Sequence, residues 1–301
     1  MTAAKRPATL VINPNAGRLA QHTIDRVADA LSETWELEVF LTTGRDTGIE
    51  ITSEAVRRGA EVVVALGGDG HVNEVVNGIV GTDCRLGIIP GGTMNVFARA
   101  LGVPQDPLAA VRHLESAGER IVPLGQMDER YFTFSAGCGF DAEAADLVER
   151  HLASKRRLGE PFFYWSAFRV LTGSYRHRRP TMLLKGEFGE VPVSMAIASN
   201  AGPYAYFFGR PVTIAPNVRL DGGIDVFALK TMRIEMLPAY MWRVVVSNDF
   251  ADHGDAFYEH DLEKFEITSD DSFARHVDGE PLPTASSARF AIVRDALKVR
   301  A

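Results

Sequence analysis

A glycine-rich turn in the first third of the chain carries the residue types best suited to binding a phosphate. It reads Gly67-Gly68-Asp69-Gly70-His71 and continues through Val72 and Asn73, after an apolar run and before a helical pattern. Glycine lets the backbone turn sharply and direct N–H groups and a helix N-terminus at an anion. A tight connection from strand to helix also needs glycine, so the turn alone is equally consistent with a structural role.

Asp69 favours chemistry over structure in this turn. A carboxylate beside bound phosphate is repulsive unless a metal ion or a transferable proton lies between them. Asp69 is therefore predicted to act through Mg²⁺ or as an acid-base group.

Two further turns of similar composition follow other apolar runs. The first is Asn13-Pro14-Asn15-Ala16-Gly17, and the second is Pro90-Gly91-Gly92-Thr93-Met94-Asn95. In the second, Thr93 offers a hydroxyl and Asn95 an amide. The alternatives are an Asx turn at a helix start for the first and an N-cap with a first helical turn for the second.

The elements around these turns predict how they meet. Short apolar runs alternate with helical patterns, which is typical of a parallel sheet with helices on its faces. Ligands of such sheets bind at the carboxyl ends of the strands, so the three turns should converge there. The predicted strands are 8–12, 37–41, 61–65 and 86–89, and the predicted helices are 19–31, 47–58 and 71–80.

The pattern changes after about residue 125, where strand-like runs separated by Gly, Pro and Asp-Gly turns dominate. The predicted fold class is a Rossmann-like α/β nucleotide domain at residues 1–130, followed by a mostly β, sandwich-like domain at residues 131–301. The last residues of the chain are allowed to pack back on the first domain. Predicted strands of the second domain are 131–135, 181–184, 191–198, 224–229, 264–268 and 289–292, with helical insertions at 140–150, 162–171 and 236–246.

Composition excludes several classes of protein. The chain has 301 residues, 46% of them hydrophobic and 24% charged, and its formal net charge is −7. No global positive field draws it to nucleic acid, and no apolar run reaches the roughly 18 residues of a spanning helix. Cys84 and Cys138 lack the spacing of metal ligands and are expected in the core. A cytoplasmic location is expected, with any membrane contact local and transient.

Taken together, the ordered segments resemble the diacylglycerol kinase catalytic domain family, in its bacterial lipid kinase branch. The most discriminating part is Gly-Gly-Asp-Gly at 67–70 with Asn-Glu-Val-x-Asn-Gly at 73–78. The resemblance extends over nearly the whole chain. The other matching segments are Asn13-Pro14-x-x-Gly17, Pro90-x-Gly92-Thr93-x-Asn95-x-Phe97-Ala98-Arg99, Gly137-Cys138-Gly139-Phe140-Asp141, Ala215-Pro216, Leu220 to Val226 and Val277-Asp278-Gly279-Glu280-Pro281.

The resemblance implies an ATP- and Mg²⁺-dependent kinase that phosphorylates a hydroxyl of a lipid such as diacylglycerol or a sphingoid alcohol. It implies that Glu280 accepts the hydroxyl proton, that Asp278 assists, and that Asp221 binds Mg²⁺. Asp221-Gly222-Gly223 and Asp278-Gly279 are also good hairpin turns. The implied ATP site comprises Asn13, Pro14, Asn15, Ala16, Gly17, Thr42, Gly67, Gly68, Asp69, Gly70, His71, Val72, Asn73, Gly92, Thr93 and Asn95.

Two positions depart from the family pattern. His71 stands where threonine is usual, and an imidazole can still donate to a phosphate. Asp46-Thr47-Gly48 stands where many relatives have Gly-Asp-Ala, which weakens the assignment of Thr42 to the ATP site. Two alternatives stay open: a kinase of a soluble substrate, because NAD kinases share the Gly-Gly-Asp-Gly turn, and a degenerate protein that binds nucleotide or lipid without turnover.

One segment of the sequence has a composition that suits contact with lipid. Basic residues at 155–157 and 175–179 flank an aromatic-rich segment at 161–168, which suits either a membrane interface or a core helix with solvated ends. Tyr204 to Gly209 suits either an acyl cavity or core packing. Peripheral membrane contact is expected, and the sequence leaves the oligomeric state open, a homodimer included.

Overall fold

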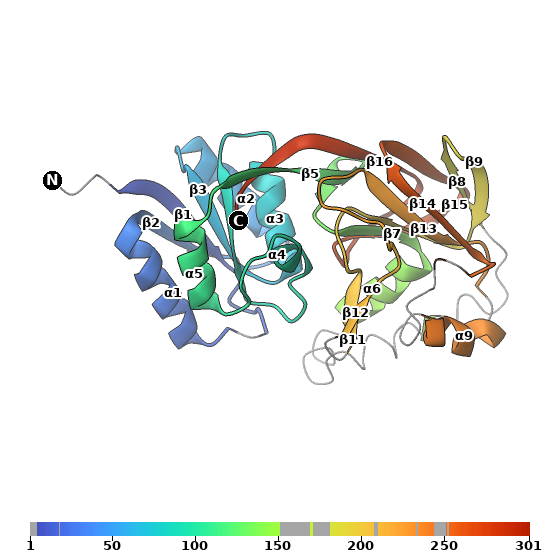
Figure 1. Ribbon diagram of the computed structural model, residues 1–301, viewed down its shortest axis with the longest axis horizontal. Coiled ribbons are helices and arrows are strands. Elements are labelled where there is room, and N and C mark those ends of the chain that lie inside the picture. Colours follow the sequence, from blue (N-terminus) through green and yellow to red (C-terminus); the bar gives the residue numbers. More distant parts are fainter. Residues whose placement is uncertain are drawn as a thin grey trace. The chain divides into compact units, whose positions relative to one another are not determined.

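The computed structural model describes residues 5–17, 19–150, 169–170, 181–207, 210–232, 234–243, 251 and 253–301. The chain divides into two compact units. Unit 1 comprises residues 1–124 and 294–301, and unit 2 comprises residues 125–293. The fold class predicted from the sequence is confirmed, with an α/β first part and a mostly β second part (Figure 1).

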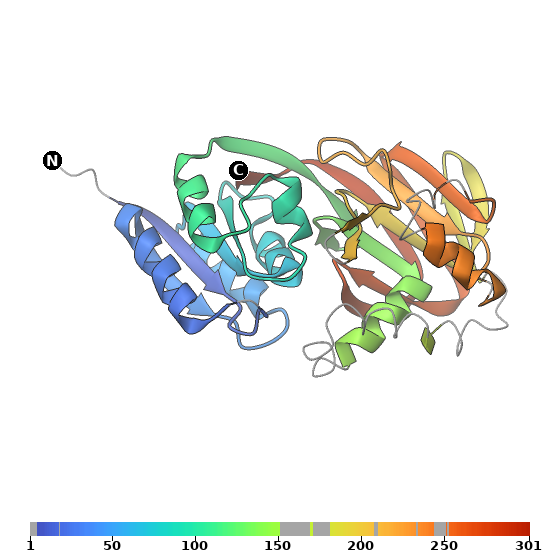
Figure 2. The same cartoon turned by 60° about the horizontal axis from the view of Figure 1, so that its bottom comes forward.

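Unit 1 is built on a parallel sheet with the strand order β4-β3-β1-β2. The central strand β3 is buried along its whole length, as its unbroken run of apolar residues predicts. Helices α1 and α5 pack together, as do α2 and α3 (Figures 1 and 2). The strands are β1 (Arg6–Ile12), β2 (Trp35–Leu41), β3 (Val62–Gly67) and β4 (Arg85–Pro90), and the helices are α1 (Gln21–Thr34), α2 (Thr47–Arg57), α3 (Asp69–Ile79), α4 (Val96–Ala100) and α5 (Pro107–Ser116).

Unit 2 is an antiparallel assembly in the order β14-β13-β10-β7-β15-β16. Off this order, β8 pairs with β15 and β9 with β8, while β5 pairs with β16 and β6 with β5. Two strands belong to both units, β5 (Glu119–Met127) and β16 (Glu280–Arg300). The other strands of unit 2 are β6 (Arg130–Phe132), β7 (Ser135–Gly139), β8 (Met182–Gly186), β9 (Gly189–Val193), β10 (Met195–Ser199), β13 (Ile224–Leu229), β14 (Ala256–Leu262) and β15 (Lys264–Val277). A separate pair, β11 (Ala205–Phe207) and β12 (Arg210–Val212), and the helices α6 (Phe140–Arg150), η1 (Ile234–Met236) and α9 (Leu237–Trp242) complete the described elements.

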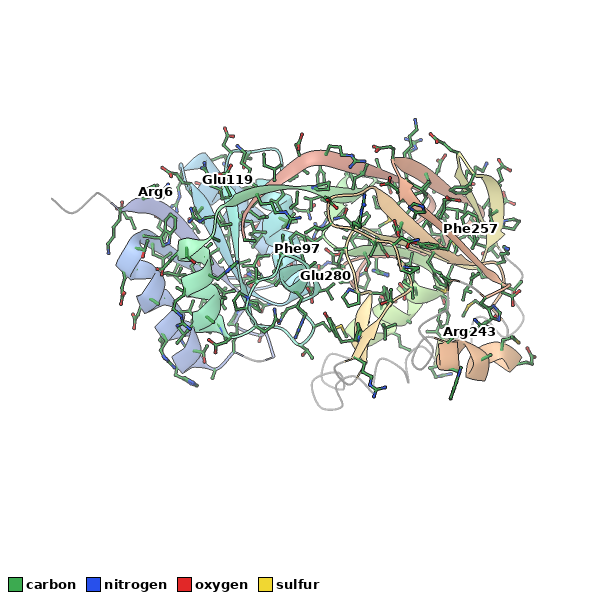
Figure 3. All side chains as sticks on the ribbon, in the orientation of Figure 1. Arg6, Phe97, Glu119, Arg243, Phe257 and Glu280 are labelled. Carbon is green, nitrogen blue, oxygen red and sulfur yellow. The ribbon has the colours of Figure 1, made fainter. Side chains whose placement is uncertain are left out.

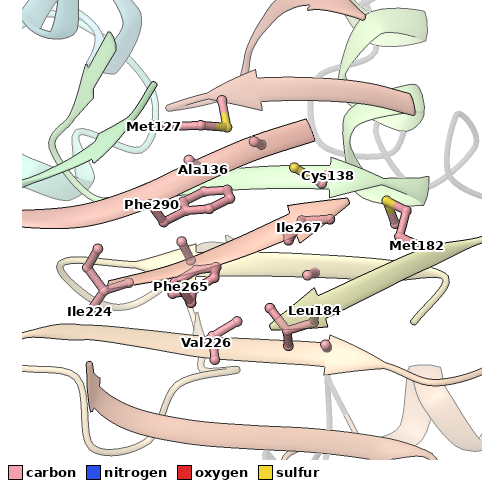
Figure 4. Packing of buried hydrophobic residues seen from close by; sticks show 14 of the residues in the cluster. Met127, Ala136, Cys138, Met182, Leu184, Ile224, Val226, Phe265, Ile267 and Phe290 are labelled. Atoms are coloured by element: carbon pink, nitrogen blue, oxygen red, sulfur yellow. The ribbon is translucent and has the colours of Figure 1, made fainter. Parts of the chain in front are cut away.

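The core of unit 2 forms between alternating inward-facing side chains of these strands (Figure 4). Phe265 and Phe290 stack at its centre with ring centroids 4.5 Å apart. Cys138 lies in the same cluster and is fully buried, as expected for a small core residue. Burial raises the pKa of its thiol well above the ordinary value.

Several strands differ from their predicted bounds. The run predicted at 191–198 is two strands, β9 and β10, interrupted at Ser194. The run predicted at 131–135 likewise splits between β6 and β7. β16 is far longer than predicted, because it pairs with β15 from Glu280 to Ala291 and its end pairs in parallel with β4 at Lys298 and Val299. Pairing with a distant strand extended it, and local sequence carries no signal for that.

Candidate active site

The turns after β3 and β4 lie against each other at the carboxyl edge of the unit 1 sheet. The N–H of Gly91 donates to the carbonyl of Gly67 at 2.7 Å. A Cβ placed on Gly92 would lie 2.6 Å from the Cα of Gly68, a separation that real Cβ atoms do not show. Only glycine at position 92 permits this close approach of the two backbones. The two turns therefore form one continuous main-chain surface.

The turn after β1 joins the same edge. The N–H of Asn13 donates to the carbonyl of Leu66 at 3.0 Å, and the Asn13 side chain accepts from the N–H of Asn15 at 2.9 Å. This is the Asx turn that the sequence allowed as an alternative. Leu19 follows the turn and packs at Gly91, where a Cβ would lie 2.6 Å from its Cδ1. The predicted convergence of the three turns is confirmed.

Thr42 lies at the end of β2 beside the first turn. Its N–H donates to the carbonyl of Ile12 at 2.8 Å, and its hydroxyl donates to the same carbonyl at 3.3 Å. The side chain is buried. Thr42 thus ties β2 to the end of β1, whatever it contributes to a ligand.

The N-terminus of α3 lies at this edge. The first N–H groups of any helix lack acceptors within the helix, and the helix dipole adds positive potential there. Asp69 is the first residue of α3, and its Oδ1 accepts from the N–H of Phe97 at 3.4 Å. Phe97 belongs to α4 and is labelled in Figure 3. Asp69 therefore lies between the two glycine turns.

Asn95 closes the turn after β4 through its own side chain. Its Oδ1 accepts from the N–H of Gly92 at 2.9 Å, and its Nδ2 donates to the carbonyl of Gly92 at 3.0 Å and to Gln105 at 3.1 Å. Asn95 is buried, whereas Thr93 is exposed. The side chain of Asn95 shapes the turn, and Thr93 is the accessible polar group on it.

His71 does not direct its Nε2 to the solvent side of the turn. The ring is buried, and Nε2 lies 2.9 Å from the carbonyl of Val11 on β1. Burial lowers the pKa of His71 to about 4, so the ring is neutral near pH 7 and Nε2 donates its hydrogen to this carbonyl. The imidazole therefore brings no positive charge to a phosphate, and it links α3 to the strand that precedes the first turn.

Glu74, in the Asn-Glu-Val-x-Asn-Gly segment, connects α3 to the start of α2. Its two carboxylate oxygens accept from the N–H of Asp46 at 2.9 Å and from the N–H of Gly48 at 2.8 Å. Those donors lie at the N-terminus of α2, where a carboxylate is favoured by the helix dipole. Asn73 and Asn77 bond each other along α3, with Asn77 Nδ2 3.1 Å from Asn73 Oδ1. The segment holds α2 and α3 together.

In unit 2, Asp278 and Gly279 form the two-residue turn between β15 and β16. Their φ angles are 48° and 81°, both in the left-handed region that such a hairpin turn requires. The buried Asp278 carboxylate accepts four hydrogen bonds: Oδ2 from the N–H and hydroxyl of Thr133, and Oδ1 from the N–H groups of Phe134 and Ser135. These contacts favour an anchoring role for Asp278 over direct proton transfer.

Glu280 is the first residue of β16 and is paired with Val277 across the turn (Figure 3). It is half-buried. The position of this residue depends directly on the conformation of the Asp278–Gly279 turn.

Asp221 stands on an exposed loop before β13. Its carboxylate lies 3.8 Å from Nε of Arg219, and the side chain is 75% exposed. Across the described residues, no group of three or more His, Cys, Asp or Glu side chains is arranged to hold a metal ion. Asp221 brings one hard oxygen ligand, of the type Mg²⁺ prefers, without a further carboxylate that completes a cluster.

A hollow of about 550 Å³ lies near this loop, lined by Asp225, His260 and Asp261 among others. The N–H of Gly223 donates to Asp261 Oδ1 at 2.7 Å, and the hydroxyl of Tyr258 donates to Asp225. Burial raises the pKa of Asp225 above its ordinary value. Sequence reasoning missed Tyr258, His260 and Asp261, because only the pairing of β13 with β14 brings them beside Asp225.

The aromatic segment at 161–168 and its basic flanks lie outside the described residues, as do residues 208–209 of the predicted acyl-cavity segment. In that segment, Ala205 to Phe207 form β11. Within the described ranges, no helix combines the length and apolar character needed to cross a membrane.

Comparisons with known proteins agree with this geometry. The model of the diacylglycerol kinase catalytic domain matches residues 7–127. The chain is 32% identical over 231 residues to a diacylglycerol kinase of Bacillus subtilis (strain 168), an alignment that covers 74% of this chain and 73% of that protein. It is 28% identical over 301 residues to a YegS-like lipid kinase of Pseudomonas syringae pv. tomato, covering 98% and 93%.

Solved structures show the same fold. A diacylglycerol kinase from Bacillus anthracis str. Sterne superposes with a TM-score of 0.74 at 22% identity, covering 99% of this chain and 98% of that one. An NAD kinase from Archaeoglobus fulgidus, solved in complex with ATP, gives a TM-score of 0.54 at 13% identity and covers 98% and 93%. At these identities the likeness concerns the fold alone.

Proposed function

The chain belongs to the diacylglycerol kinase catalytic domain family and is a lipid kinase, and from this premise we propose that it transfers the γ-phosphate of ATP to a lipid hydroxyl. The proposed acceptor is diacylglycerol or a related lipid alcohol, such as a sphingoid base. The observation that carries the proposal is the close approach of Gly68 and Gly92 beside Asp69, because it offers main-chain donors and a helix N-terminus to phosphate.

In this proposal, the phosphates of ATP lie along the turns that begin at Asn13, Gly67 and Pro90. Phosphoryl transfer to an alcohol requires positioning and electrostatic stabilisation rather than a covalent intermediate. Main-chain N–H groups at the start of α3 would stabilise the phosphate charge. His71 would contribute indirectly, since its hydrogen bond to Val11 holds the strand before the first turn.

Glu280 is the proposed base that accepts the proton of the attacking hydroxyl. Asp278 supports it by anchoring the turn to residues 133–135. Mg²⁺ bound with ATP would neutralise phosphate charge, and Asp221 and Asp69 are the carboxylates proposed to interact with it. Asp221 would contribute a single carboxylate to Mg²⁺ binding, so no step of the reaction is assigned to that residue.

The test is transfer of radiolabelled phosphate from ATP with Mg²⁺ to lipids in mixed micelles, with diacylglycerol, sphingosine and NAD as separate acceptors. We expect lipid phosphorylation by the wild type and a loss of about 100-fold or more in both Glu280→Gln and Asp69→Asn. Circular dichroism should show both variants folded. Phosphorylation of NAD in place of lipid would contradict the lipid assignment.

The two variants separate the proposed roles. Glu280→Gln should bind ATP as the wild type does, because the proposed role of Glu280 is to accept the proton of the lipid hydroxyl and not to bind ATP. Wild-type rates in Glu280→Gln would remove its role as base. ATP binding without transfer across the whole lipid panel would instead favour the non-catalytic alternative.

A further inference from the structure

Unit 2 contains a buried polar network whose residues have no role in the proposed reaction. Asp141 in the first turn of α6 and His276 on β15 are both buried, with 8% and 2% of their surfaces exposed. Asp141 Oδ2 lies 2.5 Å from His276 Nε2. The other oxygen of Asp141 accepts from the hydroxyl of Tyr204 at 2.5 Å. Asp141 is thus held from two sides.

The second ring nitrogen of His276 reaches the turn that precedes Glu280. The N–H of Gly279 donates to Nδ1 of His276 at 3.2 Å. A main-chain N–H can only donate, so Nδ1 must be the acceptor, and in the neutral ring the hydrogen then lies on Nε2. Nε2 donates that hydrogen to Asp141. The carboxylate therefore selects the tautomer that can accept from Gly279.

The side chains of Asp141 and His276 occupy the space next to Gly137, where any other residue would carry a Cβ. Gly137 on β7 is paired with His276 across the sheet. A Cβ on Gly137 would lie 2.4 Å from His276 Nε2 and 2.6 Å from Asp141 Oδ2. Any larger residue would displace the pair. The close contact gives a physical reason for glycine in the Gly137 to Asp141 segment, which the sequence left without a role.

We propose that Asp141 and His276 are positioning residues that hold the Asp278–Gly279 turn and thereby place Glu280 for proton abstraction. This inference rests on the proposed function, since it assumes that Glu280 is the base. Asp278 holds the turn from its side chain through residues 133–135, and His276 holds it from the main chain at Gly279. Small displacements of a reacting group are enough to slow a transfer strongly.

Two near-isosteric variants of His276 separate its two contacts. In His276→Asn, the amide oxygen replaces Nδ1 and can still accept from Gly279, but the bond to Asp141 is lost. In His276→Gln, the amide reaches Asp141, and the N–H of Gly279 loses its acceptor. We expect kcat for lipid phosphorylation to fall about tenfold or more in His276→Gln and clearly less in His276→Asn, with the KM for ATP within about twofold of wild type.

A variant in the hydrophobic core serves as the control for how a general loss of stability in unit 2 affects kcat. Ile267 lies in the hydrophobic cluster and is fully buried, so Ile267→Val removes one methylene group and leaves a small cavity without changing the network. We expect kcat of this variant to stay near the wild-type value. If Asn and Gln variants lose kcat equally and in proportion to their fraction unfolded, the role is structural only and the proposal fails.

The tautomer can be read without activity. Nitrogen-15 NMR of histidine-labelled protein should show His276 with hydrogen on Nε2 in the wild type and mixed tautomers in Asp141→Ala. Hydrogen on Nδ1 in the wild type would overturn the network itself. If the NMR result holds but Glu280→Gln keeps full transfer activity, the proposed base is wrong and the catalytic consequence of the network falls with it.

Discussion

Unit 1 and unit 2 hold their own candidate functional residues by opposite means. In unit 1 the surface is main chain, made where Gly68 and Gly92 approach within a distance that admits no Cβ. In unit 2 the turn before Glu280 is held by side chains, the carboxylate of Asp278 and the ring of His276. A site made from backbone should be most sensitive to added volume. A site held by side chains should be most sensitive to lost hydrogen-bonding groups.

The largest effect should come from removing the Asp278 anchor. Asp278→Ala leaves three main-chain N–H groups and the Thr133 hydroxyl without their acceptor inside the protein. Unsatisfied buried donors are costly, and we expect unfolding free energy to fall by about 3–5 kcal/mol. Chemical denaturation followed by fluorescence measures this. A change under 1 kcal/mol would show that the turn does not depend on its side chain.

The buried His71 predicts a pH dependence for unit 1. Its pKa is about 4 in the folded state against 6.5 for the ordinary group. The unfolded chain therefore binds more protons between these values, and stability is lost as the pH falls from 6.5 to 4. The shift corresponds to about 3 kcal/mol. His71→Gln lacks the titrating ring, so wild-type stability should fall more steeply than that of His71→Gln across this window.

Adding one methyl group at the glycine contact tests the role of volume. Gly92→Ala puts a Cβ against the backbone of Gly68, and the two turns must separate. We expect a loss of about 1–3 kcal/mol in stability and a weaker affinity for ATP. Gly118 is the matched control, since no atom lies within 4 Å of a Cβ placed there. Equal ATP affinity in Gly92→Ala, measured by calorimetry, would contradict a main-chain phosphate surface.

The smallest effect should come from Glu74, whose carboxylate joins α3 to the start of α2 in unit 1. In Glu74→Gln, an amide NH₂ group replaces one of the two carboxylate oxygens. That group cannot accept the hydrogen bond from Asp46 or Gly48 that the oxygen accepted. We expect a loss of about 1–2 kcal/mol in thermal or chemical unfolding. Transfer activity per folded molecule should be nearly unchanged. A large fall in kcat with little change in stability would place Glu74 in the reaction instead.

The sequence by itself determined the order of the first four strands and the first three helices of unit 1 and the meeting of its three turns, whereas α5 and β5 were not predicted. Strands followed by glycine-rich turns predict a parallel sheet whose carboxyl edge collects them, because crossover connections leave all strands pointing one way. The four strands and three helices predicted there are present, with small shifts at their ends. The family resemblance came from the same turns.

Only the tertiary structure decided what individual side chains do. His71 looked like a phosphate donor, but burial and the carbonyl of Val11 direct it inward. Glu74 marked the family in the sequence, and the structure gives it a contact across two helices. His276 carried no signal at all, since its partners Asp141 and Gly279 are set by strand pairing over more than a hundred residues and by a turn. Such contacts depend on which strands become neighbours, and local pattern does not encode that choice.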